Sequence, residues 1–282
     1  MHFIMSCTKS VTSAIVGIAA DKGYLKVNEP IFKYLPDHQQ YSSGGKENIT
    51  IEHLLTMTSG LEWDEWHAPH ATAANDIDRI YIECQDDPLA CILGKPLVHI
   101  PGSHFTYSGG NMIILGEIVR HATGMNILEF GQQYLFGPLG IDSVYWHRFY
   151  NGAFACDGSI IMLPRDMLKI GITFLHDGVW NGRRILSKEW IEKSKTIYRG
   201  NSDIQVPLDD AGRCGYAYTW WTNEIHGPKG KVKLFQASGW GGQEIIVIPD
   251  LEMVVVFTGG NYVVKKHIYK MLEHYILPSI EV

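Results

Sequence analysis

Three short β-branched runs near the carboxyl end constrain the fold more than any other part of the chain. They read KVKLFQAS (231–238), QEIIVIP (243–249) and LEMVVVFTG (251–259), and only glycine-rich or Pro-Asp turns separate them. Turns this short join antiparallel neighbours, because a parallel connection needs a dozen or more residues. The sequence therefore predicts an antiparallel meander.

Helical periodicity appears on both sides of the meander. Helices are expected at 6–21, 51–59, 108–124 and 267–277, and two more within 163–195 are joined by a turn at Asn181-Gly182. Strands and helices at both chain ends predict an α/β lobe from residues 1–22 and 150–282. The segment 23–149 predicts a mainly helical lobe, which carries Tyr107.

Composition excludes several classes of partner. The 282 residues carry a net charge of −6, so no broad basic face for nucleic acid or anionic lipid is expected. No apolar run approaches the roughly 20 residues that span a bilayer. A cytoplasmic protein is expected, since no signal peptide is recognisable.

The cysteines and histidines give no metal site. Five cysteines lack zinc-ligand spacing and favour buried or free thiols, while pairing of Cys84 with Cys91 is the lesser alternative. His67 and His70 have a ligand-like spacing but no third partner, so surface histidines are favoured. No phosphate-binding loop occurs, and no cofactor is expected.

Ser6 and Lys9 are the first candidate catalytic pair. Residues three apart share a helix face, so Lys9 can bring its amine near the Ser6 hydroxyl. The helix start adds a free N–H and a positive dipole end, which favour an oxyanion. An N-cap serine with a surface lysine is the alternative. A second Ser-x-x-Lys, Ser43 to Lys46, lies in a polar loop and is not expected to be functional.

Two further segments can complete such a site. Tyr107, in HFTYSGGN, precedes a predicted helix and could relay a proton. In FQASGWGGQEIIVIPD a strand runs into Gly239-Trp240-Gly241-Gly242, where a ligand can approach the backbone closely. A packing tyrosine and an ordinary hairpin turn are the alternatives.

Together these segments resemble the Ser-x-x-Lys, Tyr-x-Asn and Lys-Thr-Gly motifs of the β-lactamase and penicillin-binding-protein superfamily of serine hydrolases. The sequence is most similar to class C β-lactamase-like esterases and 6-aminohexanoate-dimer hydrolases, also in ITIEHLLTMTSGLEWDE and LPRDMLKIGITFLHDGVWNGRRILSKEWI. The resemblance implies a β-lactamase-like α/β (α+β) fold, with an antiparallel sheet flanked by helices and a mainly helical lobe.

The resemblance also implies roles for individual residues. Ser6 would be the nucleophile, Lys9 its base partner and Tyr107 a proton shuttle. The oxyanion hole would consist of the backbone N–H groups of Ser6 and Trp240. Substrate contacts are expected from Gly109, Asn111, Ala237, Ser238 and Gly239.

The sequence departs from the superfamily motifs at two positions. Gly109 replaces the Asn of Tyr-x-Asn, and the nearby Asn111 would point elsewhere once the helix has begun. Ala237 replaces the cation or His of the third motif. We expect both changes to enlarge the pocket and make it less charged. Because that cation binds a substrate carboxylate in β-lactams and D-Ala peptides, its loss favours a neutral ester or amide.

The start of the chain is unusually close to Ser6. The relatives carry one or two strands, and often a helix, before this segment, so an N-terminally shortened fold is expected. A mis-set or shortened start is favoured over a natural short form and over an impaired remnant. The run LEMVVVFTG would then be an exposed apolar edge, which could pair with a second copy to form a homodimer.

Three functions follow in order of preference. The first is a carboxylesterase that forms an acyl-enzyme on Ser6. The second is an amidase, a peptidase acting on D-amino or cyclic-amide substrates, or a weak β-lactamase. The third, from another class of protein, is a non-catalytic binding protein that keeps the fold. The variable loops 61–105 and 200–230 are expected to line the pocket, and their composition names no substrate.

Overall fold

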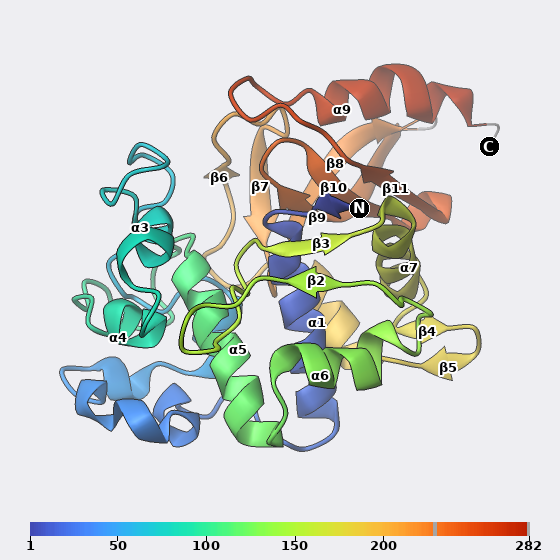
Figure 1. Ribbon diagram of the computed structural model, residues 1–282. Helices are drawn as coiled ribbons and strands as arrows, with labels where there is room; N and C mark the ends of the chain where they lie inside the picture. Colours follow the sequence, from blue (N-terminus) through green and yellow to red (C-terminus); the bar gives the residue numbers. More distant parts are fainter. Residues whose placement is uncertain (228–229, 281–282) are drawn as a thin grey trace.

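A six-stranded antiparallel sheet forms the larger layer of the protein in a computed structural model, which describes residues 1–227 and 230–280 (Figure 1). Its strand order is β11-β10-β9-β8-β7-β6, so every strand pairs with its neighbour along the chain. The predicted meander is confirmed as the last three strands. The bounds are β6 Ile204–Gln205, β7 Arg213–Tyr216, β8 Trp221–Gly227, β9 Gly230–Gly239, β10 Gln243–Ile248 and β11 Met253–Phe257.

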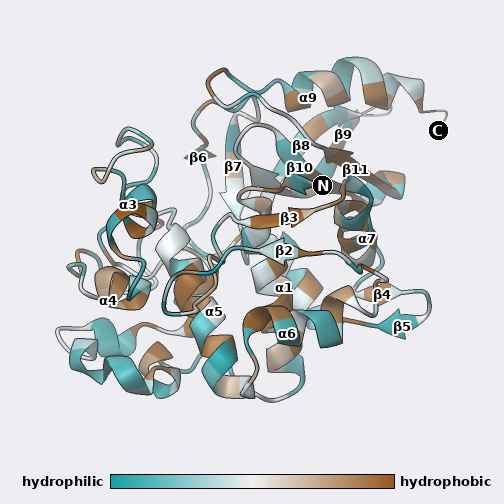
Figure 2. Ribbon diagram, viewed as in Figure 1, coloured by the Kyte–Doolittle hydropathy of each residue, from teal (hydrophilic) through white to brown (hydrophobic). Residues whose placement is uncertain are grey.

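Helices cover both faces of this sheet. The helices α1 (Cys7–Asp21) and α7 (Pro164–Leu175) lie on one face, and α9 (Ile268–Met271) continues into turns that cover the other. All six residues of β10 are buried, which explains why its sequence shows no polar alternation. Hydrophobic stretches also occur on β3, α4 and α5, away from this sheet (Figure 2).

The remaining elements form two small sheets and a group of helices. In the small three-stranded sheet β3 lies between β1 and β2, while β4 and β5 form a hairpin. The bounds are β1 His2–Phe3, α2 Ile51–Leu55, α3 Asp76–Glu83, α4 Pro88–Leu93, α5 Gly109–Thr123, α6 Ile127–Gly131, β2 Tyr145–Trp146, β3 Ile160–Met162, β4 Val179–Trp180, β5 Arg183–Arg184 and α8 Lys188–Lys195. The lobe boundaries at residues 22 and 150 stay a prediction.

The helix α1 is the centre of the core. It contacts α5, α6, β9 and β10, and thirteen of its fifteen residues are buried. Small residues allow this close packing: a Cβ at Gly17 would lie 2.5 Å from the Trp190 ring. The predicted helix over 6–21 is confirmed, and its first turn is fixed by the surrounding core.

Two local expectations change in the structure. The helix after Thr50 ends at Leu55 rather than near Gly60, because Met57 adopts a left-handed backbone with φ of 58°. The predicted turn at Asn181-Gly182 is confirmed, and both residues have positive φ, as a tight hairpin requires. The turn joins strands β4 and β5, which the sequence did not reveal.

The expectation that all five cysteines are free is wrong. Cys84 at the end of α3 and Cys91 in α4 form a disulfide, because a bend between these helices brings their Cα atoms to 6.3 Å. Cys7, Cys156 and Cys214 are free and buried. Since disulfides persist in oxidising compartments, the cysteines no longer support a cytoplasmic location. Within the described residues, none of the helices has the length and apolarity to cross a membrane.

The strand β11 forms an edge of the main sheet, as expected for LEMVVVFTG. Association through this edge remains a prediction. If two copies pair there, sedimentation will show a species of twice the 31.8 kDa chain mass that dissociates on dilution. Amide exchange of residues 253–257 should then slow as the concentration rises. A monomer at every concentration would contradict the prediction.

The Gly17→Ala variant tests the packing of α1. At an exposed helix position, alanine stabilises the protein by about 1 kcal/mol relative to glycine. Without a steric clash, the variant would therefore be more stable than the wild type. Here the new methyl meets the rigid Trp190 ring at 2.5 Å, and overpacking should cost about 1–3 kcal/mol. We expect a lower melting temperature by calorimetry. An increase would mean that Trp190 can move without loss.

Candidate active site

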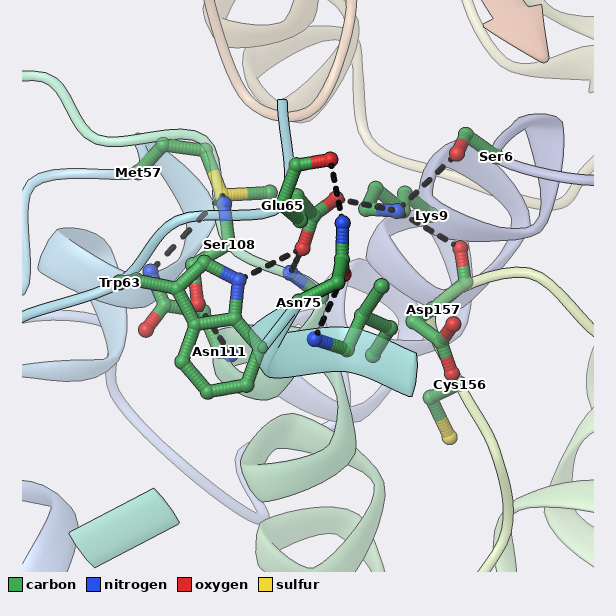
Figure 3. Close-up of polar contacts among 12 residues, drawn as sticks. Ser6, Lys9, Met57, Trp63, Glu65, Asn75, Ser108, Asn111, Cys156 and Asp157 are labelled. Atoms are coloured by element: carbon green, nitrogen blue, oxygen red, sulfur yellow. Dashed lines mark hydrogen bonds and ion pairs between the residues drawn. The ribbon is translucent and has the colours of Figure 1, made fainter. Parts of the chain in front are cut away.

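The amino end of α1 brings Ser6 and Lys9 together. Met5 has φ of 47°, a left-handed conformation that turns the chain sharply just before Ser6. One turn into the helix, Lys9 Nζ donates hydrogen bonds to Ser6 Oγ at 3.1 Å and to the Asp157 carbonyl at 2.9 Å (Figure 3). Lys9 is buried, whereas Ser6 is partly exposed. Of the two residues, Ser6 is therefore the one nearer to solvent.

Glu65 is a third member of this cluster that the sequence did not single out. Its Oε1 lies 3.8 Å from Lys9 Nζ, and its Oε2 accepts hydrogen bonds from Trp63 Nε1 at 2.7 Å and from the Gly109 N–H at 2.6 Å. Figure 3 shows the carboxylate between Trp63 and Lys9. A buried carboxylate with these partners fixes the position of the lysine amine.

The buried acids around Lys9 determine its charge. Burial alone would lower the pKa of Lys9, but Tyr107, Glu65 and Asp157 together raise it above the ordinary value. Burial raises the pKa of both carboxyl groups, and the Lys9 ammonium partly offsets this. One amine thus faces two carboxyl groups, which favour its protonated form.

Tyr107 lies just before α5 and joins the same cluster. Its ring stacks on Trp66 at 5.0 Å and Trp221 at 5.8 Å between centroids, and Lys9 Nζ is 4.8 Å from its centroid. Burial raises the pKa of Tyr107, while the nearby Lys9 charge and the Ser6 hydroxyl partly offset the increase. The structure thus brings the predicted Ser6, Lys9 and Tyr107 together.

The end of β9 approaches the chain just before Ser6. A Cβ at Gly239 would meet the Ile4 carbonyl oxygen at 2.6 Å, so only glycine permits this approach. The backbone N–H groups of Ser6 and Trp240 donate no hydrogen bond to any described residue. Both residues line the same cavity, and an oxyanion hole requires two such free N–H groups.

A cavity of about 660 Å³ opens at this point. Ser238 and Trp240, at the end of β9, line it. The lining also includes the cluster of Ser6, Lys9, Glu65 and Tyr107. His70 and Trp240 stack with ring centroids 4.8 Å apart, and the His70 ring also bonds Asp78 Oδ2 at 3.1 Å. His70 is nevertheless exposed, as expected for a surface histidine, and these contacts place its ring at the cavity. Among the described residues, no His, Cys, Asp and Glu cluster could hold a metal ion.

Three residues expected to contact substrate lie outside the lining of this cavity. Gly109 has its N–H bonded to Glu65. Asn111 is fully buried in α5 and turns its amide toward Met57, as expected once the helix has begun. Ala237 is fully buried in the core because alternate residues of β9 point away from the cavity. Ser238 and Gly239 do line it.

A larger, less charged pocket than in the family stays a prediction, and other residues lie at both departures from the motifs. Beside Gly109, Ile77 and the Glu65 carboxylate fill the space that a side chain would need. In place of the cation missing at Ala237, Lys266 donates a hydrogen bond to Ser238 Oγ at 2.9 Å. Both replacements come from segments that carry no motif, so only the three-dimensional structure reveals them.

Comparison with known proteins assigns the family. The sequence model of the family described as Beta-lactamase matches residues 1–262, and the chain therefore belongs to the β-lactamase family. The predicted β-lactamase-like fold is confirmed. The similar proteins and structures include amidohydrolases, esterases and penicillin-binding-protein homologues. The chain is therefore a member of a hydrolase family with the β-lactamase fold.

Individual relatives are distant. The 6-aminohexanoate-dimer hydrolase of Paenarthrobacter ureafaciens is 23% identical over 267 residues, which are 90% of this chain and 65% of that protein. A solved Bacillus anthracis protein, provisionally described as a 6-aminohexanoate-dimer hydrolase, is 22% identical with a TM-score of 0.77, over 95% of this chain and 69% of that one. A family VIII carboxylesterase is 17% identical with a TM-score of 0.67, covering 91% and 76%.

Proposed function

We propose that the protein is a serine hydrolase that cleaves an ester through an acyl-enzyme on Ser6. The observation that carries this proposal is the hydrogen bond from buried Lys9 to Ser6 Oγ at the edge of a cavity. A surface lysine after an N-cap serine would be solvated, whereas Lys9 is 3% exposed. Its burial and its acidic partners have a chemical rather than a solubilising function.

In the proposed mechanism, Ser6 Oγ attacks the substrate carbonyl carbon and loses its proton. A charged Lys9 cannot accept this proton, so its own proton must first move to a neighbouring acid. Glu65, 3.8 Å away and with a raised pKa, is suited to take it. The Ser6 proton then passes through Lys9 and Tyr107 to the leaving oxygen as the ester C–O bond breaks. The Ser6 and Trp240 N–H groups stabilise the oxyanion, and water releases the acid by the reverse route.

Amide hydrolysis is the second candidate. It would use the same residues, with Tyr107 protonating a leaving nitrogen instead of an oxygen. The names of the relatives favour it, since they include a 6-aminohexanoate-dimer hydrolase and a D-stereospecific amidohydrolase. A non-catalytic binding protein of this fold is the alternative from another class.

Labelling with a fluorophosphonate tests the nucleophile. We expect one covalent adduct on the wild-type protein and none on Ser6→Ala, because only an activated hydroxyl displaces fluoride. Intact mass spectrometry measures both. Ser43→Ala, in the exposed polar loop, should be labelled like wild type. No adduct on the wild-type protein would exclude the nucleophile and favour the binding protein.

The Glu65→Gln variant tests how the acid controls Lys9. Removing this negative charge should lower the pKa of Lys9, because Glu65 raises it. The rise of kcat/KM with pH should therefore move to lower pH. Hydrolysis of a p-nitrophenyl ester across the pH range measures this.

The matched control is Glu62→Gln, which removes an exposed carboxylate three residues away. Its pH profile should match that of the wild type. A Glu65→Gln profile that is unchanged, or displaced to higher pH, would show that Glu65 does not control the lysine.

A further inference from the structure

A second buried ionic cluster borders the cavity at the end of β9. Lys266, between β11 and α9, donates hydrogen bonds to Ser238 Oγ at 2.9 Å and Glu244 Oε1 at 3.0 Å, and pairs with Asp209 Oδ2 at 2.8 Å. Lys266, Glu244 and Asp209 are 7%, 1% and 5% exposed. Ser238 and Lys266 line the cavity, so this cluster borders the proposed reaction site.

The N–H and O–H protons of Lys266 and Ser238 are all used in hydrogen bonds within the cluster. An ammonium has three N–H groups, and Lys266 directs one at each of Ser238, Glu244 and Asp209. The Ser238 hydroxyl has a single proton, which it donates to Glu244 Oε1 at 3.0 Å. The hydroxyl accepts one bond from Lys266 and keeps one lone pair. Toward the cavity, Ser238 therefore offers an acceptor and no donor.

The charges around Ser238 also disfavour a substrate carboxylate. Two carboxyl groups face one ammonium, and Glu244 Oε2 is buried without a hydrogen-bond partner among the described residues. Burial raises the pKa of Glu244 to about 7, and Lys266 only partly offsets this. Asp78 lines the same cavity. Above the pKa of Glu244 both carboxyl groups of the cluster are ionised, and a substrate carboxylate would meet an acceptor and excess negative charge although a lysine is present.

We propose that Ser238, held by Lys266 and Glu244, is a specificity-determining residue that accepts a hydrogen bond from an N–H donor of the substrate, best an ammonium, and disfavours a carboxylate. This inference rests on the proposed function and narrows its substrate class to esters or amides that carry an amine or amide N–H group. It is consistent with the loss of the motif cation at Ala237, since neither proposal has a substrate carboxylate there.

Matched arylboronic acids test the proposal, because boron adds reversibly to a serine hydroxyl. The set consists of phenylboronic acids with aminomethyl, methyl or carboxyl groups, each at the meta and para positions. Inhibition constants are measured above the Glu244 pKa of about 7. In the better position, the aminomethyl compound should bind about tenfold more tightly than the methyl compound, as expected for one charge-assisted hydrogen bond. The carboxyl compound should bind most weakly.

Two variants assign this preference to the cluster. Ser238→Ala should abolish the advantage of the aminomethyl compound and leave the methyl compound within about twofold. Glu244→Gln should reduce that advantage. The control Ser159→Ala removes another cavity serine, whose hydroxyl donates to the Ala155 carbonyl at 2.8 Å, and should keep the wild-type order. An unchanged order in Ser238→Ala, or tightest wild-type binding of the carboxyl compound, would overturn the proposal.

A binding experiment on a variant without the nucleophile distinguishes failure of the hydrolase proposal from failure of the subsite proposal. In Ser6→Ala no bond to boron can form, so calorimetry with the same compounds measures the subsite alone. The aminomethyl compound should still bind more tightly than the carboxyl compound. If the fluorophosphonate does not label Ser6 but this order persists, the hydrolase proposal fails and the subsite stands. If labelling succeeds and the order is reversed, the subsite proposal fails.

Discussion

The buried ammonium of Lys9 is the interaction on which the site depends. An unpaired charge in the core would cost several kcal/mol, so the surrounding chain must supply partners. One partner, Ser6, lies on the same helix turn, and two come from distant segments: the carbonyl of Asp157 before β3 and the carboxylate of Glu65. The charge therefore joins parts of the fold that are far apart in sequence, and the same contacts keep the lysine oriented toward the serine hydroxyl.

Two motif positions have lost their side chains, and in both cases a residue from elsewhere occupies the space. Glu65 lies against the bare backbone of Gly109, and Lys266 lies beside Ser238 next to Ala237. Neither replacement restores the original chemistry. An amide has become a carboxylate next to Lys9, and a free cation has become one that two carboxyl groups neutralise. The family scaffold is thus retained, while carboxyl groups face both lysines that line its cavity.

Local patterns in the sequence predicted much of the fold. The meander follows from β-branched runs with short turns, and α1 and α5 from apolar periodicity that ends at a glycine. The Ser6–Lys9 pair follows from helical spacing, which is a local property. Glu65 and Lys266 have no such signal, because each acts on a residue 28 or more positions away in sequence. The Cys84–Cys91 disulfide likewise depends on the angle between α3 and α4, and spacing alone could not establish it.

The burial of α1 has a consequence for how the site is lost. A surface helix can fray at its end while the rest of a protein stays folded, because only solvent replaces its contacts. Nearly every residue of α1 is enclosed by the sheet and by neighbouring helices, and Ser6 stands at its first turn. Opening that turn requires separating the layers of the core. The geometry around the hydroxyl therefore has no independent melting step, and denaturation should abolish reactivity and tertiary structure in one cooperative transition.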